Sequence, residues 1–185
     1  MQMIITRENL IRLLNLDLEL EGAGAIQYIH HAARLKGAAY RQTVKAIRQF
    51  AHEKIQCALT LAEQINYLGG FVSEKVGQVH TADANEDMLW HDLRDEEDAV
   101  QRLKVRIELA RQLNEAELCE RLETILKVQQ KHIRYLKEQL EDEEAPSDGE
   151  TPGTAVDFAH EWANRAARVP IRIKKSELGQ PEDLA

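Results

Sequence analysis

The stretch GGFVSEKVGQVHTAD, Gly69 to Asp83, decides the fold, because it is a long connection between two pairs of long helical patterns. The turns within each pair are short, so each pair is expected to form an antiparallel hairpin. About fifteen residues suffice to return along a helix roughly 40 to 45 Å long. The sequence therefore predicts an all-α bundle of two hairpins joined by one long crossover. Its helices are expected over residues 7–36, 39–68, 84–113 and 115–142.

Composition narrows the class of protein. The chain has 185 residues and a formal net charge of -8, which argues against a broad nucleic-acid surface. No apolar stretch is long enough for a membrane helix, and no secretory signal is evident at the start. Cys57 and Cys119 lie far apart and form no CxxC motif. A cytoplasmic protein with no nucleic-acid or membrane partner is expected.

The composition changes after Asp142, where the helical pattern ends. Residues 143–153 are rich in acidic residues, Pro and Gly and are expected to form a polar linker. Residues 154–185 are expected to hold a short amphipathic helix followed by a tail. The predicted organisation is a bundle domain over residues 1–142, the linker, and this C-terminal region.

Polar residues interrupt the apolar stripe of each helix close to its midpoint. In a bundle of equally long helices the midpoints meet at one level, so these side chains are expected to form one buried layer. Buried charges are stable only when they are paired or bind a metal. The pattern therefore favours a present or ancestral metal site. The interrupting residues are Glu21, Lys54, Glu96, Gln129 and His132, with Cys57 one turn from Lys54.

Several segments, in order along residues 7–142, resemble the ferritin-like superfamily, and bacterioferritins most closely. The stretch LNLDLELEGAGAIQYIHHA resembles the first helix of that family and places its ligand at Glu21. The stretch LAEQINYLGG resembles the end of the second helix, and DMLWHDLRDEEDA places the bridging glutamate at Glu96. VQQKHIRYLKEQL resembles the fourth-helix segment that carries a Glu-x-x-His pair and supplies His132. The resemblance implies a ferritin-like four-helix bundle.

The resemblance also implies a di-iron site of six ligands, of which this chain keeps three: Glu21, Glu96 and His132. The second-helix Glu-x-x-His pair falls on Lys54 and Cys57, and the fourth-helix glutamate falls on Gln129. An ammonium at Lys54 would repel Fe(II) and pair with the remaining carboxylates. A normal ferroxidase centre is therefore not expected on physical grounds.

Three further side chains are candidate metal ligands. If Lys54 points outward, Glu53 can take its place beside Glu21, Glu96 and His132 and complete a mixed carboxylate–histidine site. Gln129 offers a weak oxygen ligand and Cys57 a soft sulfur ligand. The candidate metal ligands are thus Glu21, Glu53, Cys57, Glu96, Gln129 and His132. No haem is expected, because Ile55 stands where bacterioferritins place the haem-ligating methionine.

Three interpretations of function follow. The first is a bacterioferritin-like iron-binding and iron-storage protein with an impaired ferroxidase centre, assembled as a homo-oligomer such as a dimer or a cage. The alternative is a pseudo-ferritin, a structural or partner-binding bundle whose central layer is a network of salt bridges. The third is a helical adaptor unrelated to iron. Whether the chain is an enzyme stays open. His30 and His31 are expected to be partly exposed helix residues rather than ligands.

Overall fold

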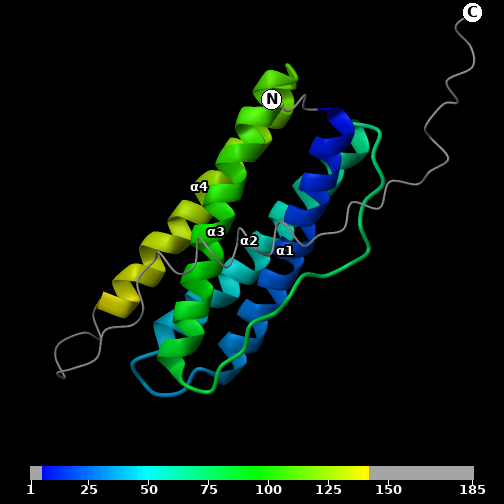
Figure 1. Cartoon of the computed structure of the whole chain (residues 1–185). Coiled ribbons are helices and arrows are strands. Elements are labelled where there is room, and N and C mark those ends of the chain that lie inside the picture. The colour runs from blue at the N-terminus through cyan, green and yellow to red at the C-terminus, as the bar shows by residue number, and fades with distance from the viewer. Residues whose placement is uncertain (1–5, 142–185) are drawn as a thin grey trace, which may run out of the picture. The chain divides into compact units, whose positions relative to one another are not determined.

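Residues 6–141 are described by the computed structural model of the chain, and within that range they form four α-helices and no strand. Helices α1 (Arg7–Arg34) and α2 (Arg41–Tyr67) make one antiparallel hairpin, and α3 (Asn85–Gln112) and α4 (Ala116–Glu141) make the second (Figure 1). The predicted all-α bundle of two hairpins is confirmed. The predicted linker and C-terminal helix lie outside the described residues.

Local chemistry explains where the helices begin and end. The Thr6 side chain accepts a hydrogen bond from the backbone N–H of Asn9 at 3.2 Å and caps the start of α1. Gly37, with φ of 105°, lies in the loop after α1, and Gly69, with φ of 82°, lies just beyond α2. Asn114 ends the third helix with φ of 58°, a conformation that asparagine tolerates better than most residues.

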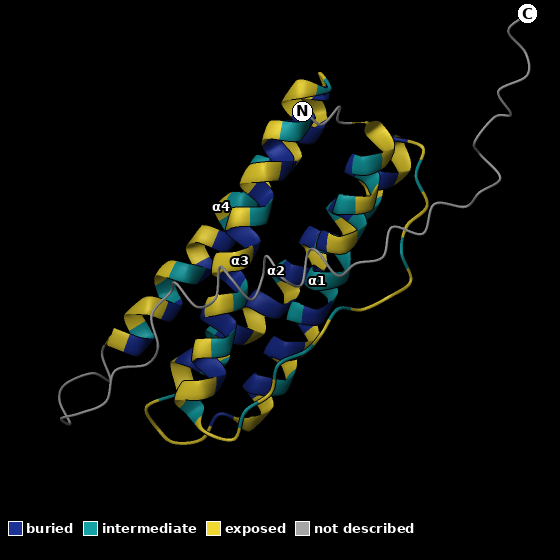
Figure 2. Cartoon of the chain, in the orientation of Figure 1, coloured by how far each residue is buried: buried dark blue, intermediate teal, exposed yellow. Residues whose placement is uncertain are grey.

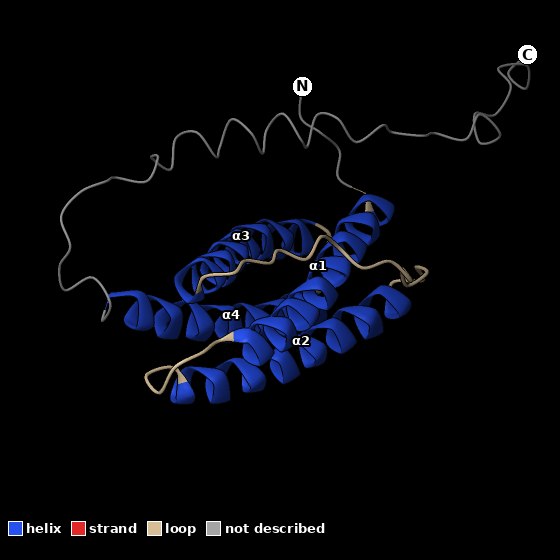
Figure 3. Cartoon of the chain, turned by 90° about the horizontal axis from the view of Figure 1, so that it is seen from below, coloured by secondary structure: helices blue, strands red, loops and turns tan. Residues whose placement is uncertain are grey.

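The long crossover between α2 and α3 runs back along α1 (Figures 1 and 3). Asn85 at the start of α3 exchanges two hydrogen bonds with the backbone of Lys36, so α3 begins beside the end of α1. Helix α3 is therefore parallel to α2 and antiparallel to α1. The hydrogen bonds that fasten the crossover along α1 include Asn15 to Phe71 at 2.9 Å, Gly77 to Glu19 at 2.9 Å, and His80 to Gln27 at 2.7 Å.

The core consists of two apolar clusters with a polar layer at the middle of the bundle. The buried residues follow the inward sides of the helices (Figure 2). The first cluster includes Leu10, Leu14, Leu61, Ile107 and Leu122, and the second includes Tyr28, Ile47, Phe50, Leu89 and Leu136. None of the four described helices has an apolar stretch of the kind that crosses a bilayer. The two apolar clusters thus lie on either side of a central polar layer, and further buried charges, such as Asp17 and Asp92, lie outside that layer.

Candidate functional site

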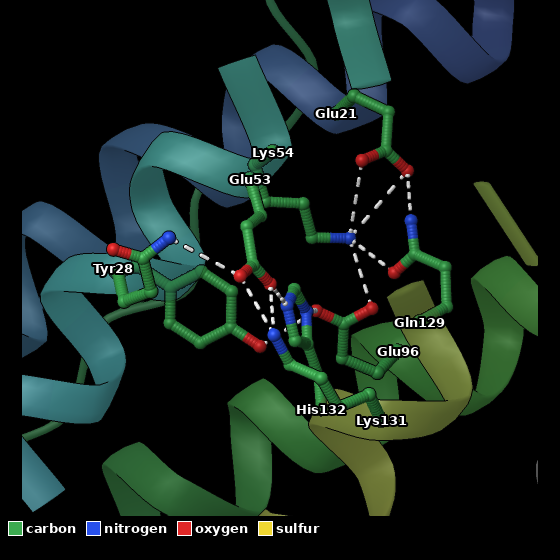
Figure 4. Close-up of polar contacts among 9 residues, drawn as sticks. Glu21, Tyr28, Glu53, Lys54, Glu96, Gln129, Lys131 and His132 are labelled. Carbon is green, nitrogen blue, oxygen red and sulfur yellow. Dashed lines mark hydrogen bonds and ion pairs between the residues drawn. The ribbon is translucent and has the colours of Figure 1, made fainter. Parts of the chain in front are cut away.

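Each of the four helices contributes a polar side chain to one point at the centre of the bundle (Figure 4). Lys54 from α2 reaches inward, with Nζ 2.9 Å from Glu96 Oε2 and 2.6 Å from Gln129 Oε1. The same nitrogen lies 3.3 Å from Glu21 Oε2, and Gln129 Nε2 donates to Glu21 Oε1 at 2.7 Å. The structure thus brings together four residues from the inward stripes, arranged around the Lys54 ammonium.

The layer is closed to solvent. Lys54 is 5% exposed, Glu21 3%, Glu96 1% and Gln129 0%. Gly24 makes room for the lysine, because a β-carbon at this position would lie 3.2 Å from Lys54 Cε. A larger residue on this face of α1 would push the ammonium away from its partners.

Burial and pairing affect the two central carboxylates differently. Burial raises the pKa of Glu21, and the Lys54 ammonium offsets only part of that rise. Burial also acts to raise the pKa of Glu96, but Lys54 and His132 outweigh it and lower the pKa to about 2. For Lys54 itself, burial acts to lower the pKa, but Glu21 and Glu96 prevail and raise it. Lys54 and Glu96 are therefore a charged pair at neutral pH.

His132 extends the network toward the surface. Its Nδ1 lies 2.8 Å from Glu96 Oε1 and its Nε2 lies 2.6 Å from Glu53 Oε2. Each ring nitrogen of His132 thus faces a carboxylate oxygen, and a hydrogen bond at either position requires a proton on that nitrogen. Lys131 donates to both Glu53 oxygens, at 2.6 and 2.8 Å, from the exposed side of α4. The Tyr28 hydroxyl donates a further hydrogen bond to Glu96 Oε1, at 2.6 Å.

Comparison with known proteins identifies the family of this chain. A family model for the ferritin-like domain matches residues 11–145. The chain belongs to the ferritin-like family. It is also similar to a crystal structure described as ferritin-like, diiron-carboxylate proteins from Bacillus anthracis str. Ames, with 32% identity and a TM-score of 0.69. That similarity covers 72% of this chain and 96% of the other. No curated protein sequence matches this chain.

The side chains of this ferritin-like chain do not fit a di-iron centre. Lys54 donates into the space between Glu21, Glu96 and Gln129, where a metal would need electron pairs from them. Two carboxylates accompanied by one ammonium supply far less negative charge than the +4 of two ferrous ions requires. Within residues 6–141, no set of three or more His, Cys, Asp or Glu side chains is arranged to hold a metal ion. The bacterioferritin subtype and the iron chemistry stay predictions.

The structure places the remaining candidates at the edges of the layer. Both Lys54 and Glu53 turn toward it, Lys54 to the centre and Glu53 to the outer side of His132. The sequence alone predicts Glu53 in the layer only if Lys54 points outward, whereas both side chains are present in its network. Cys57 is buried, and burial together with Glu21 raises the pKa of its thiol to about 12. Cys57 is therefore a thiol rather than a thiolate at neutral pH, and a poor metal ligand.

A second polar network lies between α1, α3 and the crossover, and sequence reasoning missed it. His31 is 0% exposed, so the expectation that it would be partly exposed is wrong; His30 is partly buried. The Nδ1 atom of His31 lies 2.9 Å from Asp92 Oδ1. Gln27 donates to Asp92 at 3.0 Å and to Asp95 at 2.8 Å. The available signal was the spacing of Gln27 and His31 by one helical turn, beside the face that the crossover covers.

Proposed function

We propose that this ferritin-like bundle has replaced its family's di-iron centre by a salt-bridge network around Lys54 and serves as a non-catalytic structural or partner-binding module. The observation that carries the proposal is the inward position of Lys54, whose ammonium contacts Glu21, Glu96 and Gln129 at once. An ammonium in a poorly solvated core repels a ferrous ion strongly at a separation of a few ångströms. It also supplies, without metal, the positive charge that the two carboxylates require.

The decisive experiment is an anaerobic titration of the metal-stripped full chain with Fe(II), in which calorimetry measures how many ions bind per chain. We expect no high-affinity binding. A chain that binds two ferrous ions would overturn the proposal, since Lys54 would then have to leave the centre. A chelator should likewise leave the thermal midpoint unchanged, because nothing that stabilises the fold is removed.

Restoring the family ligands gives a positive control. The triple variant Lys54→Glu, Cys57→His and Gln129→Glu rebuilds the ligand set that the resemblance implies. We expect this variant to bind two ferrous ions, since its added carboxylates and imidazole supply the missing electron pairs. The matched control is Lys54→Met, which removes the ammonium without adding a ligand and should bind none.

A second candidate function is iron handling at a smaller site. It is favoured by the position of Glu53 beside His132 and by the description of the similar structure as a diiron-carboxylate protein. Glu53, His132 and Glu96 would hold one ion if it displaced the hydrogen-bonded protons between them. This candidate predicts one ferrous ion per chain, and the binding should be lost in Glu53→Gln. The proposed metal-free module instead predicts that neither the native chain nor Glu53→Gln binds a ferrous ion.

We further propose that the partner of this module is a second copy of the chain, bound at the outer face of the α1–α2 hairpin. Asp17 and Gln27 bond to α3, so Ile29 lies on the opposite side of α1, toward α2. Glu53 bonds to α4, so Ile55 lies on the side of α2 that faces α1. The apolar side chains of this face are exposed: Ile26 by 47%, Ile29 by 57%, Ile55 by 43% and Leu59 by 52%.

Two further observations favour a second copy as the occupant. Gly22 lies on this face of α1 in mid-helix, where glycine costs about 1 kcal/mol relative to alanine. No atom of the chain lies within 4 Å of a β-carbon built there, so internal packing does not require the glycine. Its missing side chain leaves room for another backbone to approach closely. Arg48 lies toward one end of the face and Glu63 toward the other, and both are exposed. A two-fold pairing sets these opposite charges against each other.

Light scattering of the full chain tests this pairing. We expect at least a dimer for the native chain and a smaller mass for Leu59→Glu, which puts a charge in the apolar face. The matched control is Val105→Glu on α3, a residue 51% exposed, which should leave the mass unchanged. A monomeric native chain would contradict the proposal and point to another occupant for this face.

A further inference from the structure

We propose that Lys54 and Gln129 join in an intramolecular isopeptide bond, which links α2 covalently to α4 and releases ammonia. The proposal rests on the inward position of Lys54, as the proposed function does. It assigns to these two residues a reaction with each other, so the Lys54 ammonium of the proposed function belongs to a chain that has not yet reacted, and a linked chain holds a neutral amide in its place.

The nucleophile and the electrophile are already in contact. Lys54 Nζ lies 2.6 Å from Gln129 Oε1, and the carbon to be attacked is bonded directly to that oxygen. The last side-chain torsion of a glutamine is broad, and a turn about it leaves the carbon in place but rotates the plane of the carboxamide, so that a face of the carbonyl carbon can be directed toward Nζ. Both side chains are held by the fold, at 5% and 0% exposure, which removes much of the entropic barrier to a reaction between them.

Glu21 touches both reacting residues and is placed to carry protons between them. Its Oε1 accepts from Gln129 Nε2, the leaving nitrogen, at 2.7 Å. Its Oε2 lies 3.3 Å from Lys54 Nζ and accepts no hydrogen bond from the described residues, so its lone pairs are free. Burial raises the pKa of Glu21, which favours the form that holds a proton. On the other side, Glu96 Oε2 lies 2.9 Å from the same nitrogen.

The atoms and charges balance without an oxidant or a co-reactant. Glu21 takes a proton from the Lys54 ammonium, and the free amine attacks Cδ of Gln129 to form the new C–N bond. Nζ then passes a second proton to Glu96, and Glu21 returns its proton to Nε2. The bond from Cδ to Nε2 breaks and ammonia leaves, taking the proton from Glu96 as ammonium. The products are a secondary amide and one ammonium ion.

The surroundings favour this reaction over hydrolysis, although they make it slow. The layer is buried between two apolar clusters, so little water competes for the carboxamide. Glu21 and Glu96 raise the pKa of Lys54, so the free amine is a minor form. A slow reaction suffices, because each chain needs to react only once.

Mass spectrometry of the purified full chain tests the link. We expect an intact mass lower than the sequence mass by one ammonia molecule. After trypsin digestion, the missing ammonia should map to residues 49–75 joined to residues 128–131, because a linked Lys54 resists cleavage. Mapping to this pair excludes ammonia loss by cyclisation at other Asn or Gln residues. A chain that keeps its full mass after long incubation in the folded state would overturn the proposal.

Variants distinguish the Lys54–Gln129 link from loss of ammonia at other Asn or Gln residues. Lys54→Arg keeps the positive charge but lacks the amine, and Gln129→Met lacks the carboxamide; both should show the full mass. Gln130→Met changes the exposed neighbour and should still lose ammonia at residues 54 and 129. Glu21→Gln should slow the loss, and linking at the native rate in that chain would overturn the role of Glu21.

The link and the proposed function can fail separately. A full-mass chain that binds no iron overturns the link alone. A full-mass chain that binds two ferrous ions overturns both, because Lys54 must then have left the layer.

Discussion

Lys54 Nζ lies 2.9 Å from Glu96 Oε2, and the side chains of both residues are at most 6% exposed. Removing one partner of such a pair leaves the other charge buried without compensation. We therefore expect Lys54→Met to lose about 3 to 5 kcal/mol of stability at neutral pH, measured by urea unfolding. An unchanged midpoint would mean that the ammonium does not hold the layer together.

The control for this loss is a lysine that makes a similar contact at the surface. Lys131 lies 2.6 Å from Glu53 Oε1, but its side chain is 49% exposed. Solvent screens this pair, so Lys131→Met should cost less than about 1 kcal/mol. Both variants remove a lysine that pairs with a glutamate. The difference between their losses in free energy of unfolding therefore measures the effect of burial.

Glu96 predicts how stability changes in acid. Its pKa is lowered from the usual 4.5 to about 2 while Lys54 carries its charge. The stability that this carboxylate contributes is therefore present above pH 4.5 and is lost as the pH falls toward about 2. Unfolding curves across that range should show a weaker pH dependence in Glu96→Gln. Glu97→Gln, a change in an exposed residue paired with Lys137, should keep the native slope.

Gly24 predicts a coupling between a helix position and the buried ammonium. On helix propensity alone, Gly24→Ala should stabilise the chain by about 1 kcal/mol. Here the new β-carbon would lie 3.2 Å from Lys54 Cε, so we expect destabilisation instead. In a Lys54→Ala background the same change should become stabilising. A double-mutant cycle measures this reversal, and additive effects would refute the contact.

The crossover should open locally when its fastenings are removed. Gln27→Leu deletes the acceptor of the His80 backbone N–H, and Asn15→Leu deletes that of the Ser73 backbone N–H. Hydrogen exchange should therefore accelerate at His80 in the first variant and at Ser73 in the second. Each variant is the control for the other. Equal acceleration at both sites would show that the crossover opens as one unit.

Most of the fold and the centre of the site could be predicted from the sequence. The hydrophobic period of each helix, the short turns and the long connection fix the hairpins and their order. Polar interruptions at the midpoints fix the level at which Glu21, Lys54, Glu96 and Gln129 meet. The helical period predicts Lys54 on the inward stripe, and its side chain does point inward, because its ammonium finds Glu96 and Gln129 there.

The rest depends on contacts that helical periodicity does not encode. His31 is buried because it pairs with Asp92, on a side of α1 close to the crossover and outside the predicted stripe. Asp17 is buried for a similar reason, between Arg102 and Arg106 of α3 at 3.2 and 2.7 Å. Glu53 reaches His132 across the seam between α2 and α4, a position that depends on how the hairpins pack.

The distribution of charges between the hairpins bears on the folding pathway. Lys54 and Glu21 belong to the first hairpin, whereas Glu96 and His132 belong to the second. Glu53 of the first hairpin also contacts His132, so the central layer draws charged groups from both hairpins. Contacts within each hairpin are local in sequence, whereas those of the layer span both, so the layer is complete only after the two halves meet. Lys54 gains Glu96 and Gln129 as partners only when the hairpins dock, so a misassembled bundle would leave its ammonium buried with Glu21 alone.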